Sequence, residues 1–581
     1  MPERARKKRR REERVIPPPK QPVSPFWLYL TAVAAGLIVL FVVYRPALHG
    51  PFVFDDATQP YDTPNFSTSL RAWISGVRPL LMASYWMNYT DSTAPLGFHV
   101  TNVLIHFLNG WLIFAIVRKM QQIATPAIAS GTRTLLAAFA AAVFLLHPIQ
   151  TESVAYIAGR SESLSVFFFL AAFAVFIYRR STVVSWRVAI VVQLLAAAAF
   201  LSKEHTAVLP ALLLLTDYYW NPGFSFSGIR KNWRIYIPIA VAAVGGLLFI
   251  LRILSFAGFS AGFGLKDFTW YQYFFTECRA FFVYLRLMII PFGQSLDWDF
   301  SISHTIVEHG AIFGLVAILL LIAVALYFRK RFPLASYGFL VYVLLMAPTS
   351  SFVPIRDPIA ERRLYLPMIG LLLIVTAVLQ HVRIERRKLA TSLGVVTLVL
   401  LLITFQRNQV WASDVTLWED TARESPGKSR VHFQLARIYF DHHRWSDAEK
   451  EFAAIARIEK PDYGVLVDWG LALSHMDQLD AALAKLREAA AQNPTAHVYS
   501  EIGKVYGEHS MWREAVESLA HAESINPNYD MIYDNLGVIH TKMNDLPAAA
   551  ADFQHALQVN PSNEHARNAL NVVQQQLAAP R

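Results

Sequence analysis

The chain has 581 residues, 54% of them hydrophobic, and a formal net charge of +10 at pH 7. A mean hydropathy of +0.33 excludes a single soluble globule. The Lys and Arg residues occur in short clusters between apolar segments rather than on one face, which argues against nucleic-acid binding. The single cysteine, Cys278, excludes an intramolecular disulfide and a Cys-based zinc site. The composition predicts a polytopic membrane protein with an attached soluble domain.

The N-terminal region has a basic run from Arg4 to Arg14, followed by an apolar stretch from Phe26 to Tyr44. A cleaved signal peptide would have a shorter apolar region and a small-residue cleavage site, and Val43 to Pro46 offers none. The stretch is therefore interpreted as an uncleaved signal anchor. The basic run could be a nuclear or nucleic-acid tag, but beside a membrane span it predicts that residues 1–25 form a cytoplasmic tail.

Further apolar segments continue the membrane domain, which is predicted to cover residues 26–410. They lie at roughly 98–117, 134–146, 163–178, 188–201, 206–219, 235–255, 309–328, 333–347, 364–380 and 389–405. With the first, they predict about eleven crossings, with the basic connections all cytoplasmic. This threading keeps 256–308 outside, so the apolar piece from Phe281 to Pro291 is predicted to lie at the interface or to dip partway in. An odd number of crossings places everything after Phe405 on the non-cytoplasmic side.

Two of these segments are too short to cross a bilayer. Leu135 to Leu146 and Val188 to Leu201 would reach only about 18 to 21 Å as helices, against a hydrocarbon core of about 30 Å. Each ends in polar residues, at 147–160 and 202–205, and charge at that depth needs a water-filled cavity or a partner. The lengths predict a polar cavity open to the outer face, with snorkelling side chains as the alternative.

The outer segments supply the side chains for this cavity. The first outer loop, 45–97, contains Asp55 and Asp56, which are either functional or a helix N-cap pair. Arg362 and Arg363 lie where a helix would enter the membrane and suit a phosphate at headgroup depth, with snorkelling as the alternative. The other polar candidates are Arg78, His147, Glu152, Arg160, Glu162, Lys203, Glu204 and His205. Their spacings match no closed metal-ligand pattern, so no metal site is predicted.

From Trp411 onward the composition becomes mixed, and a repeat of about 34 residues appears, the length of a tetratricopeptide unit. Gly503 and Gly537 occupy the same position in successive copies and are small where paired helices would cross closely. About four or five repeats and a capping helix predict an α-solenoid over 411–581, so the whole fold is expected to be all-α. Such an array offers a concave surface for a peptide or protein and specifies no reaction.

A set of short motifs occurs in a fixed order along the chain. They are Phe52–Asp56, Arg78–Leu80, Gly97–His99, His147–Arg160, Ser202–Glu204 and Glu361–Pro367. Together they resemble the transmembrane-and-tetratricopeptide (TMTC) O-mannosyltransferases over nearly the whole chain. That family consists of GT-C-fold glycosyltransferases, which take a sugar from a polyprenyl phosphate at the non-cytoplasmic face. The resemblance implies a catalytic aspartate at Asp55 or Asp56 and a lipid-phosphate site of basic residues, although this chain has fewer repeats than animal members usually carry.

The residues fit that chemistry. Moving a sugar from a phosphate to a hydroxyl needs a base near the acceptor oxygen and positive charge near the departing phosphate. Asp55 or Asp56 is the expected base. The expected phosphate clamp is Arg160, Lys203, Arg362 and Arg363, and the expected supporting cavity is Arg78, His147, Glu152 and Glu204. No cofactor or divalent metal is expected with a cationic clamp, although the two aspartates could hold Mg²⁺.

We therefore expect an inverting transfer of a sugar, mannose by the resemblance, to protein Ser or Thr hydroxyls. The repeats would bind the acceptor at the periplasmic face of a bacterial inner membrane or in the endoplasmic reticulum.

Two alternatives remain. A transporter should show inverted repeats and Gly- or Pro-broken spans in matched halves, which the sequence does not show. A non-enzymatic membrane scaffold, whose repeats bind protein partners, would make no use of Asp55.

Overall fold

The structure is a computed structural model and describes residues 25–179, 181–256 and 261–578. Within this part of the chain the regular elements are helices, and the one pairing of extended backbone is an isolated bridge between Ala261 and Ile355. The all-α fold expected from the sequence is confirmed. Of the predicted basic tail, only Pro25 falls within the described residues.

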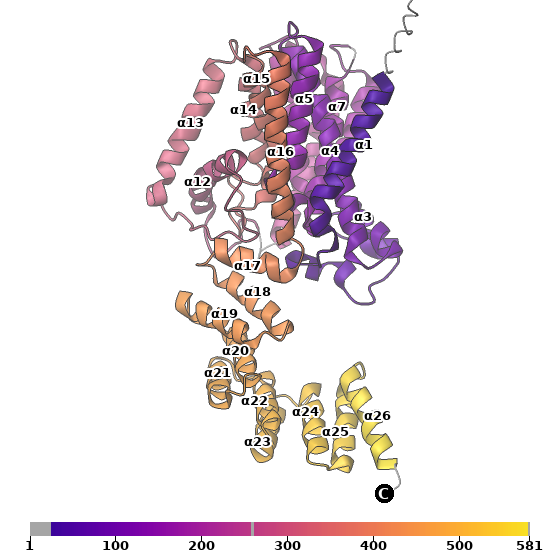
Figure 1. The fold of residues 1–581 in the computed structure, drawn as a ribbon, viewed down its shortest axis with the longest axis vertical. Coiled ribbons are helices and arrows are strands. Elements are labelled where there is room, and N and C mark those ends of the chain that lie inside the picture. Colours follow the sequence, from indigo (N-terminus) through magenta and orange to yellow (C-terminus); the bar gives the residue numbers. More distant parts are fainter. Residues whose placement is uncertain (1–24, 180, 257–260, 579–581) are drawn as a thin grey trace, which may run out of the picture.

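The predicted apolar segments all lie on helices, most of which stand side by side in the upper part of Figure 1. Among the described residues, six stretches are long and apolar enough to cross a membrane: Leu30–His49, Pro95–Ala124, Ile157–Ile177, Trp233–Arg252, Glu308–Tyr327 and Arg386–Val410. α5 and the short helices after it pass the same test together, with a bend of 52° between them. The chain is therefore a multi-pass membrane protein. The bundle helices are α1 (Pro25–Tyr44), α4 (Pro95–Ala124), α5 (Ser130–Leu146), α7 (Arg160–Ile177), α8 (Trp186–Ser202), α9 (Leu209–Trp220), α11 (Trp233–Phe256), α13 (Ala311–Tyr327), α14 (Pro333–Met346), α15 (Met368–Leu379) and α16 (Arg386–Val410).

α5 and α8 cover the two short apolar segments, and each has 17 residues. At 1.5 Å per residue they are about 26 Å long, more than the predicted length of about 18 to 21 Å. The difference arises because α5 begins at Ser130 and α8 at Trp186, ahead of the apolar runs. Both helices still fall short of a hydrocarbon core of about 30 Å, and a polar segment follows each of them.

Short helices connect the bundle helices. One of them, α10 (Ser227–Lys231), joins α9 to α11. The others belong to the connections nearest the repeats: η1 (Arg45–His49), η2 (Phe54–Thr58), η3 (Pro60–Asp62), α2 (Leu70–Ile74), α3 (Pro79–Asp91), η4 (Pro148–Gln150), α6 (Thr151–Val154), η5 (Ile157–Gly159), η6 (Glu204–Val208), η7 (Glu308–Gly310) and η8 (Glu361–Leu364). α12 (Trp270–Ile289) contains most of the piece predicted to lie at the interface. It is seen nearly end-on in Figure 1, across the long helices, and it is not among the helices that meet the length and composition criteria for a span.

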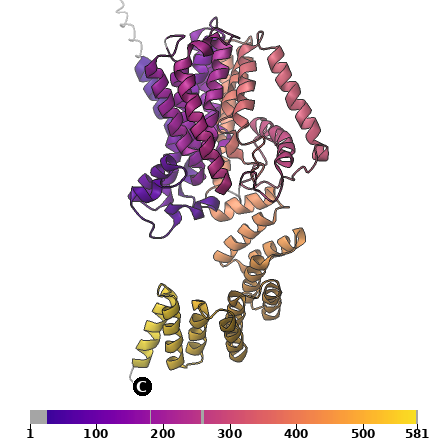
Figure 2. The ribbon, with the colours of Figure 1, turned by 180° about the vertical axis from the view of Figure 1, so that it is seen from behind.

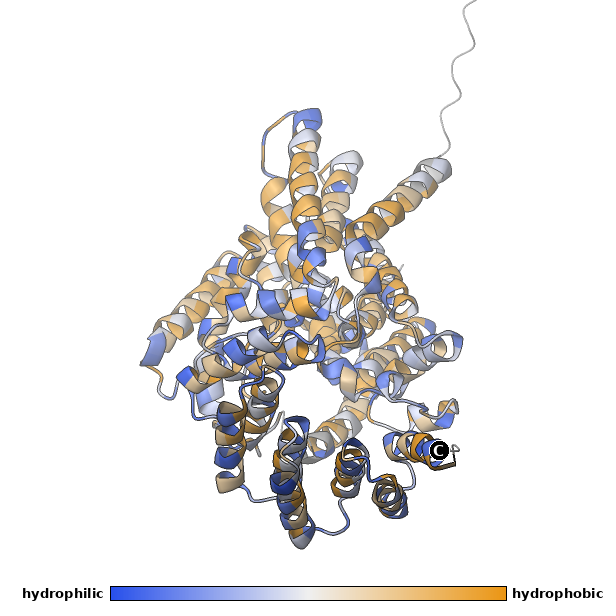
Figure 3. Cartoon of the chain, turned by 60° about the horizontal axis from the view of Figure 1, so that its bottom comes forward, coloured by the Kyte–Doolittle hydropathy of each residue, from blue (hydrophilic) through white to orange (hydrophobic). Residues whose placement is uncertain are grey.

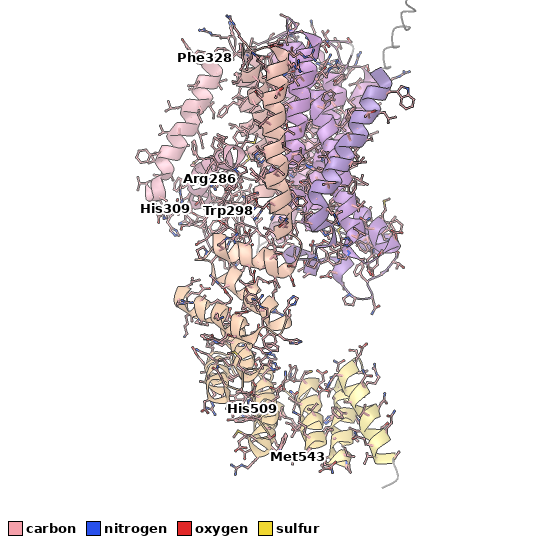
Figure 4. The ribbon with its side chains drawn as sticks, viewed as in Figure 1. Arg286, Trp298, His309, Phe328, His509 and Met543 are labelled. Atoms are coloured by element: carbon pink, nitrogen blue, oxygen red, sulfur yellow. The ribbon has the colours of Figure 1, made fainter. Side chains whose placement is uncertain are left out.

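The connections rich in Lys and Arg lie at the end of the bundle opposite the repeats. α13 starts beside His309, on the side of the repeats, and ends beside Phe328, at the far end (Figure 4). Arg329, Lys330 and Arg331 follow Phe328 directly. The basic connection at 329–331 thus lies on the face opposite the repeats, where the positive-inside threading puts it. Which compartment each face meets stays a prediction.

The C-terminal part consists of antiparallel helix pairs stacked in a curved row (Figure 1 and Figure 2). Each of its helices carries both hydrophilic (blue) and hydrophobic (orange) residues in Figure 3, whereas the bundle helices are largely hydrophobic. α17 (Asp414–Glu424) precedes the first pair and α26 (Glu564–Ala578) ends the row. The four pairs are α18 (Ser429–Asp441) with α19 (Trp445–Ile458), α20 (Tyr463–Ser474) with α21 (Leu479–Gln492), α22 (Ala496–Glu508) with α23 (Trp512–Ile525), and α24 (Asp530–Lys542) with α25 (Leu546–Val559). The predicted tetratricopeptide solenoid is confirmed.

Glycines lie where the two helices of a pair cross. A Cβ at Gly503 would lie 2.7 Å from Leu519 Cγ and 3.1 Å from the carbonyl oxygen of Ala515. A Cβ at Gly537, one repeat later, would lie 2.7 Å from the ring of Phe553. The small residues predicted at these positions therefore allow the helices their close approach.

Gly503→Val should loosen the α22–α23 pair by about 1–3 kcal/mol, because the added side chain overlaps Leu519. Amide hydrogen exchange across residues 496–525 of the full-length protein should accelerate accordingly. Gly464→Ala is the matched control, because its added Cβ would meet Asp462 Oδ1 no closer than 3.5 Å. Equal protection in the two variants would contradict this account of the repeat spacing.

Candidate active site

Four outer segments meet at the end of the bundle nearest the repeats. η2 contacts η5, α6 contacts η8, and α3 contacts α8. The contacts bring the first outer loop together with the segments that follow α5 and α8 and precede α15. The side chains predicted to line one cavity therefore lie in one region, where they differ in burial and in partners.

The two adjacent aspartates have opposite environments. Asp56 is fully buried and accepts hydrogen bonds from the N–H groups of Val53 (3.1 Å) and Ala158 (2.9 Å) and from Tyr61 Oη (2.7 Å). Burial raises the pKa of Asp56 to about 7, and these hydrogen bonds oppose the rise. Asp56 thus ties the first outer loop to η5. Asp55, in contrast, is exposed.

The backbone around Asp55 has an uncommon conformation. Phe54 has a φ of +54°, in the left-handed region that a bulky side chain rarely adopts. The N–H of Asp55 donates to Tyr156 Oη at 2.9 Å. Among the described residues, no hydrogen bond or salt bridge engages the Asp55 carboxylate, whose negative charge raises the pKa values of Tyr156 and Arg362. Asp55 is therefore the more accessible of the two aspartates.

Arg362 joins the last outer segment to the second. Its guanidinium pairs with Glu152, whose side chain is 2% exposed, and its backbone N–H donates to the same carboxylate at 2.8 Å. Burial opposes the charge on Arg362, but Glu152, Tyr156 and Asp55 raise its pKa, so it stays cationic. Of the groups that raise the pKa of Arg362, Glu152 and Tyr156 are buried and Asp55 is exposed.

Arg363 faces the other way, toward α12. Its guanidinium donates to the carbonyl oxygens of Pro358 and Asp357, both at 2.5 Å, and to Tyr273 Oη at 3.3 Å, and it lies 3.7 Å from Glu277. These partners hold the segment of chain that precedes η8. The adjacent arginines are therefore not both available to one phosphate: the side chain of Arg362 is 23% exposed, whereas Arg363 is 7% exposed and braces the loop.

Lys203 sits beside a buried carboxylate. Its Nζ lies 3.3 Å from Glu162 Oε1 and 3.3 Å from Ser161 Oγ. His205 Nε2 lies 3.4 Å from the other oxygen of Glu162, which accepts no hydrogen bond from the described residues. The Lys203 side chain is 15% exposed, so these partners enclose it only in part.

Arg78 and Glu204 form a two-point ion pair between the first outer loop and the segment that follows α8. Nε and Nη2 of Arg78 donate to the two oxygens of Glu204 at 3.0 and 2.6 Å. Burial disfavours the charged carboxylate, but the Arg78 guanidinium holds the pKa of Glu204 at about 2. The pair links α3 to η6 and keeps both side chains ionised at neutral pH.

Two predicted site residues have structural roles instead. Arg160 is completely buried and donates to Asn102 Oδ1 (2.7 Å) and to the carbonyl oxygens of Ser84 (3.0 Å) and Phe98 (2.9 Å). These contacts leave it no access to a donor phosphate. The ring of His147 caps η4, accepting from Ile149 N–H, and its other nitrogen bonds the carbonyl oxygen of Met288. Both residues are buried and use their nitrogens on protein atoms, so neither is open to a ligand, contrary to the sequence-based prediction.

Some residues at the site were not among the sequence-based candidates. Tyr156 lies between Asp55 and the repeats. It belongs to the motif His147–Arg160, within which the sequence does not single it out. A charged cluster also joins the outer loops to the first repeat, with Arg430 bound to Asp297 and Asp357. No spacing in the sequence pairs these residues. Among the described residues, no group of three or more His, Cys, Asp or Glu is arranged to hold a metal ion.

Comparison with known proteins places the chain near one family. No protein-family model matches it. It is 25% identical over 458 residues to "Protein O-mannosyl-transferase F38B6.6" of Caenorhabditis elegans, which covers 74% of this chain and 62% of that protein. It is 23% identical over an alignment of 617 residues to "Protein O-mannosyl-transferase TMTC3" of Homo sapiens, covering 93% of this chain and 66% of that protein. The chain thus spans just under two thirds of these relatives' length, and the resemblance to TMTC proteins is confirmed.

A solved structure also aligns with the repeats. It is the crystal structure of a thermophilic TPR protein of Thermus thermophilus, which is 19% identical. The match covers 31% of this chain and 96% of that one, with a TM-score of 0.26.

Asp56→Asn should destabilise the protein, whereas Asp55→Asn should not. An amide at position 56 places an N–H₂ group against one of the buried donors, at a cost of about 1–3 kcal/mol. Thermal unfolding in detergent at pH 8, where Asp56 is ionised, should show a lower midpoint for Asp56→Asn alone. Equal midpoints for the two variants would contradict the structural role given to Asp56.

Proposed function

We propose that this TMTC-like chain is a membrane glycosyltransferase that moves a sugar, mannose by its relatives' names, from a polyprenyl phosphate to Ser or Thr hydroxyls of protein. The similarity to proteins named O-mannosyl-transferases supports the reaction class. The observation that carries the proposal is the exposed Asp55 carboxylate, which no described residue hydrogen-bonds, in the same region as the cationic group of Arg362, whose pKa it helps to raise. One supplies a base and the other a partner for phosphate.

The solvent exposure of each basic side chain decides which residues are included in the proposed phosphate clamp. The side chains of Arg78, Arg362 and Lys203 are 35%, 23% and 15% exposed, so each has donors that a ligand can reach. Arg363 is 7% exposed and Arg160 is completely buried, and both use their donors on protein oxygens. The clamp is therefore proposed to consist of Arg78, Arg362 and Lys203, without the two arginines that the sequence also favoured.

In the proposed reaction the acceptor hydroxyl attacks the anomeric carbon from the face opposite the phosphate. The new C–O bond forms as the bond to the phosphate oxygen breaks, the hydroxyl proton passes to Asp55, and the electron pair leaves with the phosphate. Arg362 and its neighbours stabilise the charge that develops there. Inversion at the anomeric carbon follows from a single displacement. Because fixed cations meet the phosphate, the proposed mechanism uses no divalent ion.

The array is proposed to hold the acceptor. It projects from the end of the bundle where α17 begins the array (Figure 1), and Phe54, next to Asp55, packs against Trp418 of α17. A cavity of about 320 Å³ lies across α22, α24 and α26, lined in part by Lys504, Asn535, Lys542 and His565. Charged and amide groups beside apolar ones suit an extended peptide with polar side chains. We propose that both lie on the non-cytoplasmic side, with the N-terminus cytoplasmic.

Asp55→Asn should lower the transfer rate by about 10² to 10⁴, the usual contribution of a positioned base, without changing the fold. Incorporation of labelled mannose from polyprenyl-phosphate mannose into a Ser/Thr-rich synthetic peptide measures it. Asp62→Asn is the matched control, since Asp62 is exposed on the same loop. Wild-type protein that transfers no sugar, or an Asp55→Asn variant that transfers normally, would favour the scaffold alternative.

A cysteine at exposed Ser524, in a Cys278→Ser background, should react with an impermeant thiol reagent from the non-cytoplasmic side. The positive-inside threading is the reason, since it places the array opposite the basic connections. Thr182→Cys in the same background is the control and should react only after the membrane is opened. The reverse pattern would overturn the orientation and, with it, the proposed reaction.

A further inference from the structure

The first units of the array share one apolar core with the loop that carries Asp55. This core combines Val53 and Tyr156 of the membrane domain with Trp411 and Trp418, at the start of the array. The rings of Tyr156 and Trp411 are stacked, with centroids 6.1 Å apart. A Cβ at Gly50 would lie 2.4 Å from the carbonyl oxygen of Trp411, so the backbones themselves are in contact. The array is therefore built onto the candidate site rather than tethered near it.

Phe54, the residue before Asp55, is the point of closest engagement. Its ring packs edge-on against Trp418 of α17, with centroids 5.8 Å apart, and the guanidinium of Arg430 lies 5.6 Å from the ring centroid. A bulky residue in the left-handed conformation carries strain that persists only where the surroundings impose it. Together with the bond from Asp55 N–H to Tyr156, these two array residues supply that constraint.

Arg430 is itself fixed by the outer loops. Its Nε and Nη2 donate to both oxygens of Asp297 at 2.6 Å, and Nη2 also donates to Asp357 Oδ1 at 2.6 Å. Lys428 pairs with the same Asp297, whose side chain is 1% exposed. Since the segment from Asp357 leads directly to Arg362, one arginine of α18 contacts both the residue before the proposed base and the loop of the proposed phosphate clamp.

We infer that Trp418 and Arg430 are positioning residues, through which the start of the tetratricopeptide array holds Phe54 in its left-handed conformation and so aims Asp55 at the reacting centre. The inference rests on the proposed function and extends it, because it gives the array a part in the chemistry as well as in acceptor binding. On this view the array sets the turnover rate of a bound substrate and leaves donor affinity nearly unchanged.

Arg430→Gln in the full-length protein tests the inference. Amide exchange at residues 53–58 should rise about tenfold, the scale of a lost, partly desolvated cation–π contact. The kcat for mannose transfer from polyprenyl-phosphate mannose to a Ser/Thr-rich synthetic peptide should fall by a similar factor, with the donor KM within about twofold. Arg437→Gln is the matched control on the same helix, because its partners, Phe433 and Asp468, both belong to the repeats.

Phe54→Leu provides a second variant in case loss of Arg430 unfolds the protein by leaving Asp297 partly unpaired. It keeps an apolar side chain, leaves no buried charge, and should raise exchange and lower kcat in the same way. Exchange and kcat equal to those of the Arg437→Gln control would overturn the inference, as would faster exchange with an unchanged kcat. If the wild-type protein transfers no mannose, the proposed function fails, while the exchange rates still decide whether the array fixes the loop.

Discussion

Charge buried near the outer face of the bundle needs opposite charge within hydrogen-bonding reach, and this requirement organises the whole region. The pairs of Glu152 with Arg362 and Glu162 with Lys203 each join segments that are distant in sequence. Breaking a buried pair by removing one partner typically costs about 3–5 kcal/mol, because the remaining charge is left without compensation. The same pairing holds the side chains of Arg362 and Lys203, which are 23% and 15% exposed, beside buried carboxylates. Ion pairs between loops therefore explain why these loops cohere without regular secondary structure beyond short helices.

Local geometry assigns different roles to neighbouring residues of like charge. Asp55 and Asp56 lie in η2, and Arg362 and Arg363 lie in η8, both 3₁₀ helices. With about three residues per turn, successive side chains point roughly 120° apart, so the two members of each pair cannot face the same partner. In each case one residue is more exposed and the other is enclosed by protein. Two adjacent residues of like charge in the sequence thus indicate where the candidate site lies. Only one of each pair is accessible there.

The sequence predicts much of this architecture because the relevant signals are local. Apolar runs locate the bundle helices, and the spacing of Gly503 and Gly537 locates the paired helices of the array. The candidate site is predicted less completely, since the role of a polar residue depends on partners far along the chain. Arg160 has its donors taken by oxygens of the first outer loop and α4. The contact of Arg430 with Asp297 joins two domains, and no repeat pattern or motif encodes it.

The shared core has a consequence for the order in which the protein matures. Phe54 leaves the ribosome early, but its partner Trp418 is synthesised some 360 residues later, at the other end of the membrane domain. At elongation rates of about 5–20 residues per second, the loop waits roughly 20 to 70 seconds for that partner. Contacts between such remote parts of a chain also form slowly once both are present. A nascent chain therefore inserts most of its membrane domain before the strained turn beside Asp55 can be completed. The loop that carries Asp55 thus reaches its final conformation only after the start of the array has been made and has folded against it.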